Sequence, residues 1–466
     1  MPDPIQQTDT AQFRSLLRSF AFDPGLIADH FLDDEHLARV IDQEIPQTRA
    51  RIFTPLITLA TFLAQIFSDD HSCQAALDRL LAWRAARGLP PASPDTGGYC
   101  KARQRLPETL LPRLVRETAE RIDDQVSEAW LWQGRRVILV DGSAVSMPDT
   151  PENQAAYPQP SIQKPGCGFP VARVVVLIAL ATGVVLDAAV GRCTGKLTGE
   201  STLLRGLHIR LRRDDIVLAD RYYCSYFEVA LLQAQGVDLV TRLNKGRAVD
   251  FRRGRRLGKD DHLVEWARPQ RASWMDKELY ATIPETLTVR ELRVRVGQRG
   301  FRTRVLIVAT TLLDAGSFSH SELAGLYRAR WHVELDLRSI KLTLKMDVLR
   351  CKTPEMVRKE LWGHLLISNL IRGVMAESAR RHGVLPRRLS FQGVRQMLEG
   401  FRVELNGASP EAVEGLIAVQ MRMMSKLSVG DRPDRYEPRV RKRRAKAYPL
   451  MHMPRKRSRK LMAKAG

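Results

Sequence analysis

Four residues in the C-terminal half of the chain have side chains suited to phosphate chemistry: Tyr327, Arg330, Glu334 and Lys341, at steps of three, four and seven residues. On an α-helix of about 3.6 residues per turn, this spacing places the four side chains on one face. One carboxylate would then stand beside an arginine, a lysine and a tyrosine, all of which bind phosphate. The alternative is a solvated helix face, where ion pairs contribute only about 0.2 to 0.5 kcal/mol each.

The segment from Ser319 to Leu344 is predicted to form the helix that carries this series. Ser319 and Glu322 have the spacing of a capping box, which is a start signal for a helix. Asp336 falls on a different side of the helix and is not part of the series.

Two aspartates close apolar runs that are typical of strands: Asp141 ends VILVD, and Asp220 ends VLAD. If these strands are neighbours, the two carboxylates meet, and with Glu334 they supply oxygen ligands for two Mg²⁺ ions. Mn²⁺ may substitute, because hard oxygen ligands accept both ions. An isolated aspartate after a strand is more often a turn or strand-end residue, so the interpretation depends on the combination of all three acids.

The elements that must position these residues begin at Arg135. Three antiparallel strands are predicted in RRVILVDGSAV, ARVVVLIALATG and VVLDAAVGRC, followed by a helix, a strand, a helix and the strand VDLVTR. The order βββαβαβ, with the Glu334 helix after it, is that of an α/β ribonuclease H-like core. In that fold the first and fourth strands lie side by side.

Changes in periodicity predict five regions. They are an all-α DNA-binding domain at 1–130, the catalytic core at 131–245 and 305–350, a β-rich insertion at 246–304, a helical region at 351–430 that could dimerise, and a basic tail at 431–466. Basic residues that could line a DNA face of the first region are Arg49, Arg51, Arg84, Arg87, Lys101, Arg103 and Arg105.

The formal charge of +22 and the pI of about 10.1 favour a polyanionic partner. The last 36 residues alone hold 14 basic and 3 acidic side chains. The six cysteines form no metal-binding spacing and read as reduced thiols. The longest apolar run, Val174 to Leu186, is too short to cross a bilayer. We therefore expect double-stranded DNA as the partner, no membrane association and a cytoplasmic, nucleoid-associated protein.

With these residues in place, the sequence resembles the insertion-sequence DDE transposases of the insertion-sequence-four family. Its signature Y-x(2)-R-x(3)-E-x(6)-K is matched at all four positions, and VDGSAV and ADRYY stand at the two aspartate sites. The resemblance implies Asp141, Asp220 and Glu334 as metal ligands, and Tyr327, Arg330 and Lys341 as contacts to transposon-end phosphates. Arg242 is similar in position to another phosphate-binding arginine of the family, although a solvated strand end is an equal alternative.

The resemblance further implies a cut-and-paste bacterial transposase that pairs two transposon ends as a homodimer, cleaves through a DNA hairpin and joins the element to target DNA. Family members stack a flipped base on a tryptophan of the insertion. Here Trp266 and Trp274 lie upstream of the expected place, and Trp331 reads as a packing residue, so that role has no candidate. Two alternatives remain: a catalytically silent, transposase-derived DNA-binding protein or repressor, and a ribonuclease H-like nuclease without joining activity.

Overall fold

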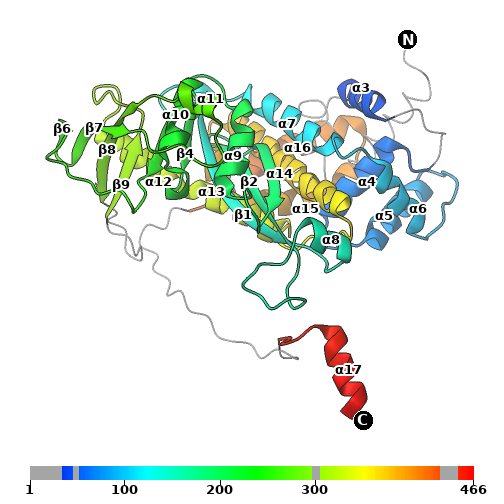
Figure 1. The fold of residues 1–466 in the computed structure, drawn as a ribbon. Helices are drawn as coiled ribbons and strands as arrows, with labels where there is room; N and C mark the ends of the chain where they lie inside the picture. The colour runs from blue at the N-terminus through cyan, green and yellow to red at the C-terminus, as the bar shows by residue number, and fades with distance from the viewer. Residues whose placement is uncertain (1–33, 46–51, 296–304, 431–449, 466) are drawn as a thin grey trace. The chain divides into compact units, whose positions relative to one another are not determined.

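The computed structural model describes residues 34–45, 52–295, 305–430 and 450–465 (Figure 1). Arg49 and Arg51 lie outside these ranges, as do residues 431–449 and 466 of the basic tail. The chain divides into two compact units, which are described separately: one of Met1–Trp130, Ala181–Asp187 and Asp336–Val429, and one of Leu131–Leu180, Ala188–Leu335 and Gly430–Gly466. None of the described helices combines the length and apolar character that crossing a membrane requires.

The first unit is built from helices at both ends of the sequence. They are α3 (Asp34–Glu44), α4 (Pro55–Phe67), α5 (Cys73–Ala85), α6 (Gly97–Arg105), α7 (Leu110–Asp123), α14 (Pro354–His382), α15 (Phe391–Gly407) and α16 (Pro410–Met424), with short 3₁₀ turns at Glu128–Trp130 and Pro386–Arg388. Helix α14 packs against α4 and α7. Thr353 caps its start, and Gly383, at φ +63°, ends it in the left-handed conformation that glycine adopts without strain.

Two groups of buried polar side chains in this unit are paired. The carboxylate of Asp336 accepts hydrogen bonds from Arg372 Nη2 at 2.6 Å and Arg387 Nη1 at 2.7 Å. The side-chain amide of Asn369, on α14, binds both backbone polar groups of Val185. Asp336 is therefore held by a structural ion cluster, in agreement with its exclusion from the phosphate-binding series.

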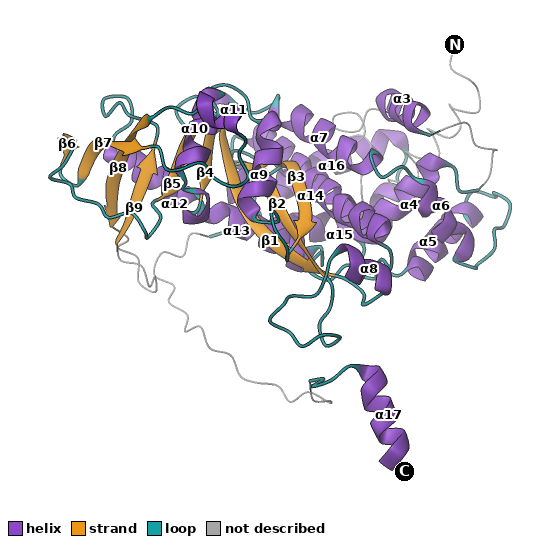
Figure 2. Ribbon diagram, viewed as in Figure 1, coloured by secondary structure: helices purple, strands orange, loops and turns teal. Residues whose placement is uncertain are grey.

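The second unit contains a mixed α/β arrangement around one nine-stranded sheet of order β3-β2-β1-β4-β5-β9-β8-β7-β6 (Figure 2). The strands are β1 (Val137–Ser146), β2 (Val171–Ala179), β3 (Val185–Arg192), β4 (Ile216–Ala219), β5 (Asp238–Arg242), β6 (Arg255–Gly258), β7 (Asp261–Ala267), β8 (Thr286–Arg295) and β9 (Val305–Thr310). β1 runs antiparallel to β2 and parallel to β4, which is parallel to β5. The predicted strands and their order along the chain are thus present.

Strand β1 is longer than the sequence indicated. It continues five residues beyond Asp141, to Ser146, because that extension pairs with β2 down to the contact of Ser146 with Val171. Its pairing with β4 covers only Val137 to Leu139. The prediction that Asp141 closes its strand is therefore wrong: Asp141 lies inside β1, where the strand has left its neighbour β4. Asp220, in contrast, directly follows β4 as predicted.

Helices complete this unit: α8 (Pro151–Ala156), α9 (Glu200–Leu207), α10 (Tyr226–Ala234), α11 (Lys277–Thr282) and α12 (His320–Ala329), with 3₁₀ turns at His208–Arg210 and Arg221–Tyr223 and, in the tail, α17 (Arg455–Ala465). The capping box of Ser319 and Glu322 is formed. The predicted single helix to Leu344 is wrong, because it divides at Arg330 into α12 and α13 (Trp331–Arg338), and a π-helical turn follows at Ser339–Thr343.

The strands of the insertion extend the core sheet. β9 pairs antiparallel with β5 on one side and with β8 on the other, so β6, β7 and β8 continue outward from the core strands. Trp266, on β7, is 2% exposed and forms part of the core beneath these strands. The insertion is therefore joined to the core through backbone hydrogen bonds.

Candidate active site

Asp141 and Asp220 lie at the same level of neighbouring strands. β1 and β4 are parallel with Leu139 opposite Leu218, and extending this register by two positions places Asp141 level with Asp220. Asp220 is fixed by two contacts: its carboxylate accepts from Tyr222 N at 2.7 Å, and its carbonyl accepts from the Thr241 hydroxyl at 2.7 Å. The two carboxylates therefore come from adjacent, backbone-anchored positions.

The environment of Asp141 disfavours its charged form. Its pKa is raised to about 6, mainly by burial and to a smaller extent by the negative charges of Asp220 and Glu334. A hydrogen bond from Gly142 N at 2.8 Å and the positive charge of Arg330 act in the opposite direction. These influences place Asp220, Glu334 and Arg330 within electrostatic range of Asp141.

Glu334 is held by the arginine one helical turn before it. Arg330 Nη2 lies 2.5 Å from Glu334 Oε1, and the two side chains are 17% and 38% exposed. The break between α12 and α13 leaves Arg330 in right-handed helical conformation, so the predicted shared face survives across it. Burial lowers the pKa of Arg330, but the hydrogen bond to Glu334 together with the negative charges of Glu334 and Asp141 and the influence of Tyr327 raises it overall, so the guanidinium stays charged.

Tyr327 joins the same site. It is 7% exposed, and burial raises its pKa to about 12, while the charges of Arg330 and Arg242 lower it and that of Asp220 raises it. Tyr327 thus lies near both arginines and one aspartate, and its hydroxyl remains a proton donor at neutral pH. Arg242 is the last residue of β5, as predicted.

Lys341 is the one predicted site residue in the other compact unit. It lies in the π-helical turn at Ser339–Thr343 of the first unit. The remaining six predicted residues belong to the second unit.

The sequence interpretation missed two residues beside the aspartates. Tyr223 is 1% exposed, and its pKa is raised by burial and by the charges of Glu200, Asp141 and Asp220. Its hydroxyl lies 3.4 Å from Glu200 Oε2. Tyr223 is the last residue of the ADRYY segment, and its place three residues after Asp220 is the sequence feature that could have identified it. Glu200 had none, because it is the first residue of an ordinary amphipathic helix.

The donor set fits a hard divalent cation. Three carboxylates offer only oxygen ligands, which Mg²⁺ prefers, and their mutual repulsion would be relieved by a cation. Within the described ranges, no three His, Cys, Asp or Glu side chains lie close enough together to hold a metal ion as they stand. At Glu334 the Arg330 guanidinium supplies the positive charge that faces the carboxylate.

Both tryptophans of the insertion make contacts with other side chains. Trp266 donates from Nε1 to Glu291 Oε1 at 2.9 Å, and the Arg247 guanidinium lies 4.0 Å from its ring centre. Trp274 has the Arg205 guanidinium at 3.7 Å and packs edge-on against Phe227. Trp266 is buried, and the Trp274 ring already has a guanidinium over it, so the base-stacking role stays without a candidate.

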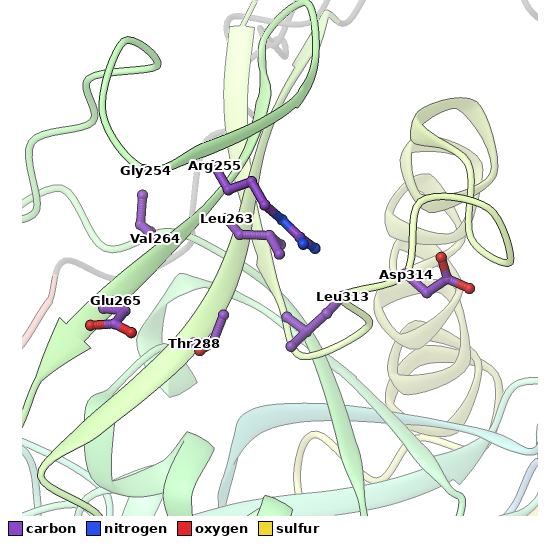
Figure 3. A pocket seen from close by; sticks show the side chains of 8 residues that line it. All are labelled: Gly254, Arg255, Leu263, Val264, Glu265, Thr288, Leu313 and Asp314. Atoms are coloured by element: carbon purple, nitrogen blue, oxygen red, sulfur yellow. The ribbon is translucent and has the colours of Figure 1, made fainter.

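The insertion also contains a separate cavity of about 600 Å³ (Figure 3). It is lined by Gly254, Arg255, Leu263, Val264, Glu265, Thr288, Leu313 and Asp314. None of the predicted site residues lines it, so it is distinct from the carboxylate site.

The basic residues predicted on the N-terminal helices divide into two groups. Arg103 and Arg84 are each 8% exposed and serve structural roles: Arg103 binds Gln65 Oε1 at 3.1 Å, and Arg84 binds the Pro90 carbonyl at 2.9 Å. Their assignment to a DNA face is therefore wrong. Arg87, Lys101 and Arg105 are exposed.

Comparison with known proteins agrees with the geometry. Residues 132–370 match the transposase DDE domain. The chain is 30% identical over 357 residues to the transposase InsG for insertion sequence element IS4 of Escherichia coli (strain K12), covering 75% of this chain and 77% of that one. The transposase for insertion sequence element IS421 of Escherichia coli is 32% identical over 72 residues, which is 16% of this chain and 19% of the relative.

A solved synaptic complex of piggyBac transposase with hairpin DNA covers 88% of this chain and 85% of its own, at 10% identity and a TM-score of 0.42, a similarity too low to support a conclusion. The domain match spans just over half of the chain and includes Asp141, Asp220 and Glu334. The chain therefore belongs to the DDE transposases of the insertion-sequence-four family, enzymes that cleave DNA and transfer its strands.

Proposed function

We propose that this enzyme binds the terminal inverted repeats of an insertion sequence, cuts the element out with the help of divalent metal ions and joins it to target DNA. The observation that carries the proposal is that Asp141 lies close enough to Asp220, Glu334 and Arg330 to be influenced by the charge of each. A protein that only bound DNA would have no use for three repelling acids beside phosphate-binding groups, because acids weaken phosphate binding.

Asp141, Asp220 and Glu334 are the proposed ligands of two Mg²⁺ ions, with Mn²⁺ as a substitute. Such a pair of ions activates a water or a 3′-hydroxyl and stabilises the departing oxygen of a phosphodiester. Asp141 must be ionised for this role, and the raised pKa of its carboxyl means that ion binding and proton release are coupled.

Four residues are proposed to hold the transposon end. Arg330 can bind a phosphate bidentately, Tyr327 donates one hydrogen bond, and Lys341 and Arg242 supply positive charge. Because Arg330 is bonded to Glu334 in the DNA-free chain, arrival of a phosphate would release that carboxylate for a metal ion.

Other parts of the proposal follow the family. Each nicked end exposes a 3′-hydroxyl that attacks the opposite strand and forms a hairpin, and two chains pair the two ends as a homodimer. Residues 1–130 and the basic tail 431–466 contact DNA, 351–430 contributes to the dimer, and the enzyme works in the cytoplasm at the nucleoid.

The test is cleavage of a labelled duplex carrying the terminal repeat that flanks the gene, in the presence of Mg²⁺. Wild type should cut at the repeat boundary. Glu334→Ala and Asp220→Asn should bind the duplex normally and cut at least 1000-fold more slowly, since each removes a metal ligand. Asp214→Asn is the control, because Asp214 is exposed in the turn before β4 and asparagine tolerates its positive φ of 68°.

Binding without cleavage by the wild type would instead identify a silent, transposase-derived binding protein. Cleavage without preference for the repeat would identify a nuclease. Cutting by Glu334→Ala at the wild-type rate would remove Glu334 from the mechanism.

A further inference from the structure

The carboxylate of Glu200 lies directly against the backbone of β1, one residue beyond Asp141. A Cβ atom built on Gly142 would stand 2.4 Å from the Glu200 carboxyl carbon, so any side chain at position 142 would displace it. Glu200 begins α9, and its side chain is 29% exposed. Glycine at position 142 therefore creates the space in which this carboxylate sits.

Tyr223 connects the same carboxylate to the segment that carries Asp220. It ends the 3₁₀ turn at Arg221–Tyr223, whose N-cap is Asp220. The Tyr223 hydroxyl donates to Glu200 Oε2 at 3.4 Å. Burial and the surrounding carboxylates raise the pKa of Tyr223, so the phenol keeps its proton and remains a hydrogen-bond donor at any working pH.

Arg173, on β2, completes the arrangement from a third element. Its Nε lies 3.7 Å from Glu200 Oε1, and its Nη1 donates to the Thr198 carbonyl at 2.7 Å. The start of α9 is thus held to the sheet at two points, and Glu200 touches both aspartate-bearing segments.

We propose that Glu200 and Tyr223 are positioning residues of the active site, which hold the segments of Asp141 and Asp220 at a fixed separation. This inference rests on the proposed metal-dependent cleavage. A glutamate in the first turn of a helix is favoured by the helix dipole alone. The dipole explains neither a buried tyrosine bonded to that glutamate nor a glycine that leaves room for it.

The experiment compares three variants of the full chain: Glu200→Ala, Tyr223→Phe and Glu200→Gln. Removing a group that orients a metal ligand typically lowers metal affinity by about 10-fold or more. Glu200→Ala and Tyr223→Phe should therefore need about 10-fold more Mg²⁺ for half-maximal cleavage. Mn²⁺ binding to the protein–DNA complex, measured by electron paramagnetic resonance, should weaken equally. Glu200→Gln should recover near wild-type values, because its amide oxygen still accepts from Tyr223.

Matched controls use the same substitutions away from the site. Tyr226→Phe removes a hydroxyl that donates to the Pro284 carbonyl at 2.7 Å, and Glu152→Ala removes an exposed glutamate from the first turn of α8. Both controls should match wild type in Mg²⁺ dependence. Melting temperature and affinity for the repeat should be unchanged in every variant. If Glu200→Ala does not fold, the metal dependence of Tyr223→Phe alone tests the positioning role, because that substitution removes only one oxygen atom.

Two results would overturn the inference. Unchanged metal dependence in Tyr223→Phe and Glu200→Ala would show that the contact positions nothing. Equal loss in Glu200→Gln and Glu200→Ala would show that the charge itself binds the ion. Failure of the wild type to cleave would overturn the proposed function instead, so the two failures are distinguishable.

Discussion

Asp141 is more costly to ionise than an ordinary surface aspartate. Its pKa of about 6 in the folded chain, against 3.8 for an unperturbed aspartate, means that the folded state binds a proton more tightly than the unfolded state between these values. The contribution of Asp141 to the free energy of unfolding is therefore fully present below pH 3.8 and is lost as the pH rises through about 6. A rise of this size corresponds to at most about 3 kcal/mol at neutral pH.

Asp141→Asn should accordingly raise the free energy of unfolding at pH 7.5 by up to about 3 kcal/mol and leave it unchanged near pH 3.5. The same variant should lose cleavage. Chemical denaturation at the two pH values measures the effect. Asp214→Asn, at an exposed turn, should show no such dependence on pH, and an equal gain for Asp141→Asn at both values would contradict the electrostatic account.

At this scale the residues of the proposed site could be named from the sequence, whereas the residues that support them could not. Asp220, Arg242 and the series Tyr327, Arg330 and Glu334 were recognisable, because strand ends and helical spacing are local properties. Glu200 was not, because its significance depends on the space above Gly142, which lies 58 residues away in the chain.

At the scale of elements, the start of the helical segment that carries Glu334 was predicted correctly. The prediction that it is one unbroken helix was wrong. Ser319 and Glu322 form their capping box, a contact between near neighbours. The division at Arg330 and the π-helical turn after Arg338 are not encoded by glycine or proline. Asp336, two residues after Glu334, is held by Arg372 and Arg387, which come from distant parts of the sequence. Side-chain periodicity carries no information about such tertiary contacts.

A side chain of helix α14 supplies hydrogen-bond partners to the backbone of strand β3, and this contact can be tested. The Asn369 side chain accepts from Val185 N at 2.7 Å and donates to Val185 O at 2.8 Å, and β3 is an edge strand of the sheet. Asn369→Leu would leave both buried backbone groups without these partners, at a cost of about 1 to 3 kcal/mol for each. We expect a destabilisation of about 2 to 6 kcal/mol in urea unfolding.

Ser378→Ala, on the same helix, is the control for that substitution. Its hydroxyl makes a single bond to the Met421 carbonyl at 2.9 Å, so its loss should cost only about 1 kcal/mol. Equal effects of the two substitutions would mean that Asn369 is not the main support of Val185.

For the whole molecule, the excess of positive charge predicts how the affinity for DNA depends on salt concentration. Residues 431–466 account for 11 of the 22 excess positive charges. Affinity of the full chain for duplex DNA should fall steeply as salt rises, with a logarithmic slope of about 0.9 per phosphate contacted. A chain ending at Gly430 should bind more weakly at low salt and show a smaller slope. Fluorescence anisotropy between about 50 and 200 mM salt measures both, and equal slopes would exclude the tail from phosphate contact.

The order of strands along the chain was predictable, because alternating apolar runs and turn residues mark each one. The continuity of the sheet was not, since it depends on β9 pairing with both β5 and β8, and strand partners far apart in sequence leave no periodic signal. Burial of Arg84 and Arg103 was missed for a similar reason: a charged residue reads as exposed until its buried partners are known.

The close approach of Glu200 to Gly142 also has a consequence for inheritance. Two positions that share the same space constrain one another: a larger residue at 142 requires the flexible Glu200 side chain to leave its place against β1. Among descendants of this gene, substitutions of Gly142 should therefore accompany substitutions of Glu200 more often than chance predicts, whereas glutamine at position 200 alone should be compatible with a mobile element.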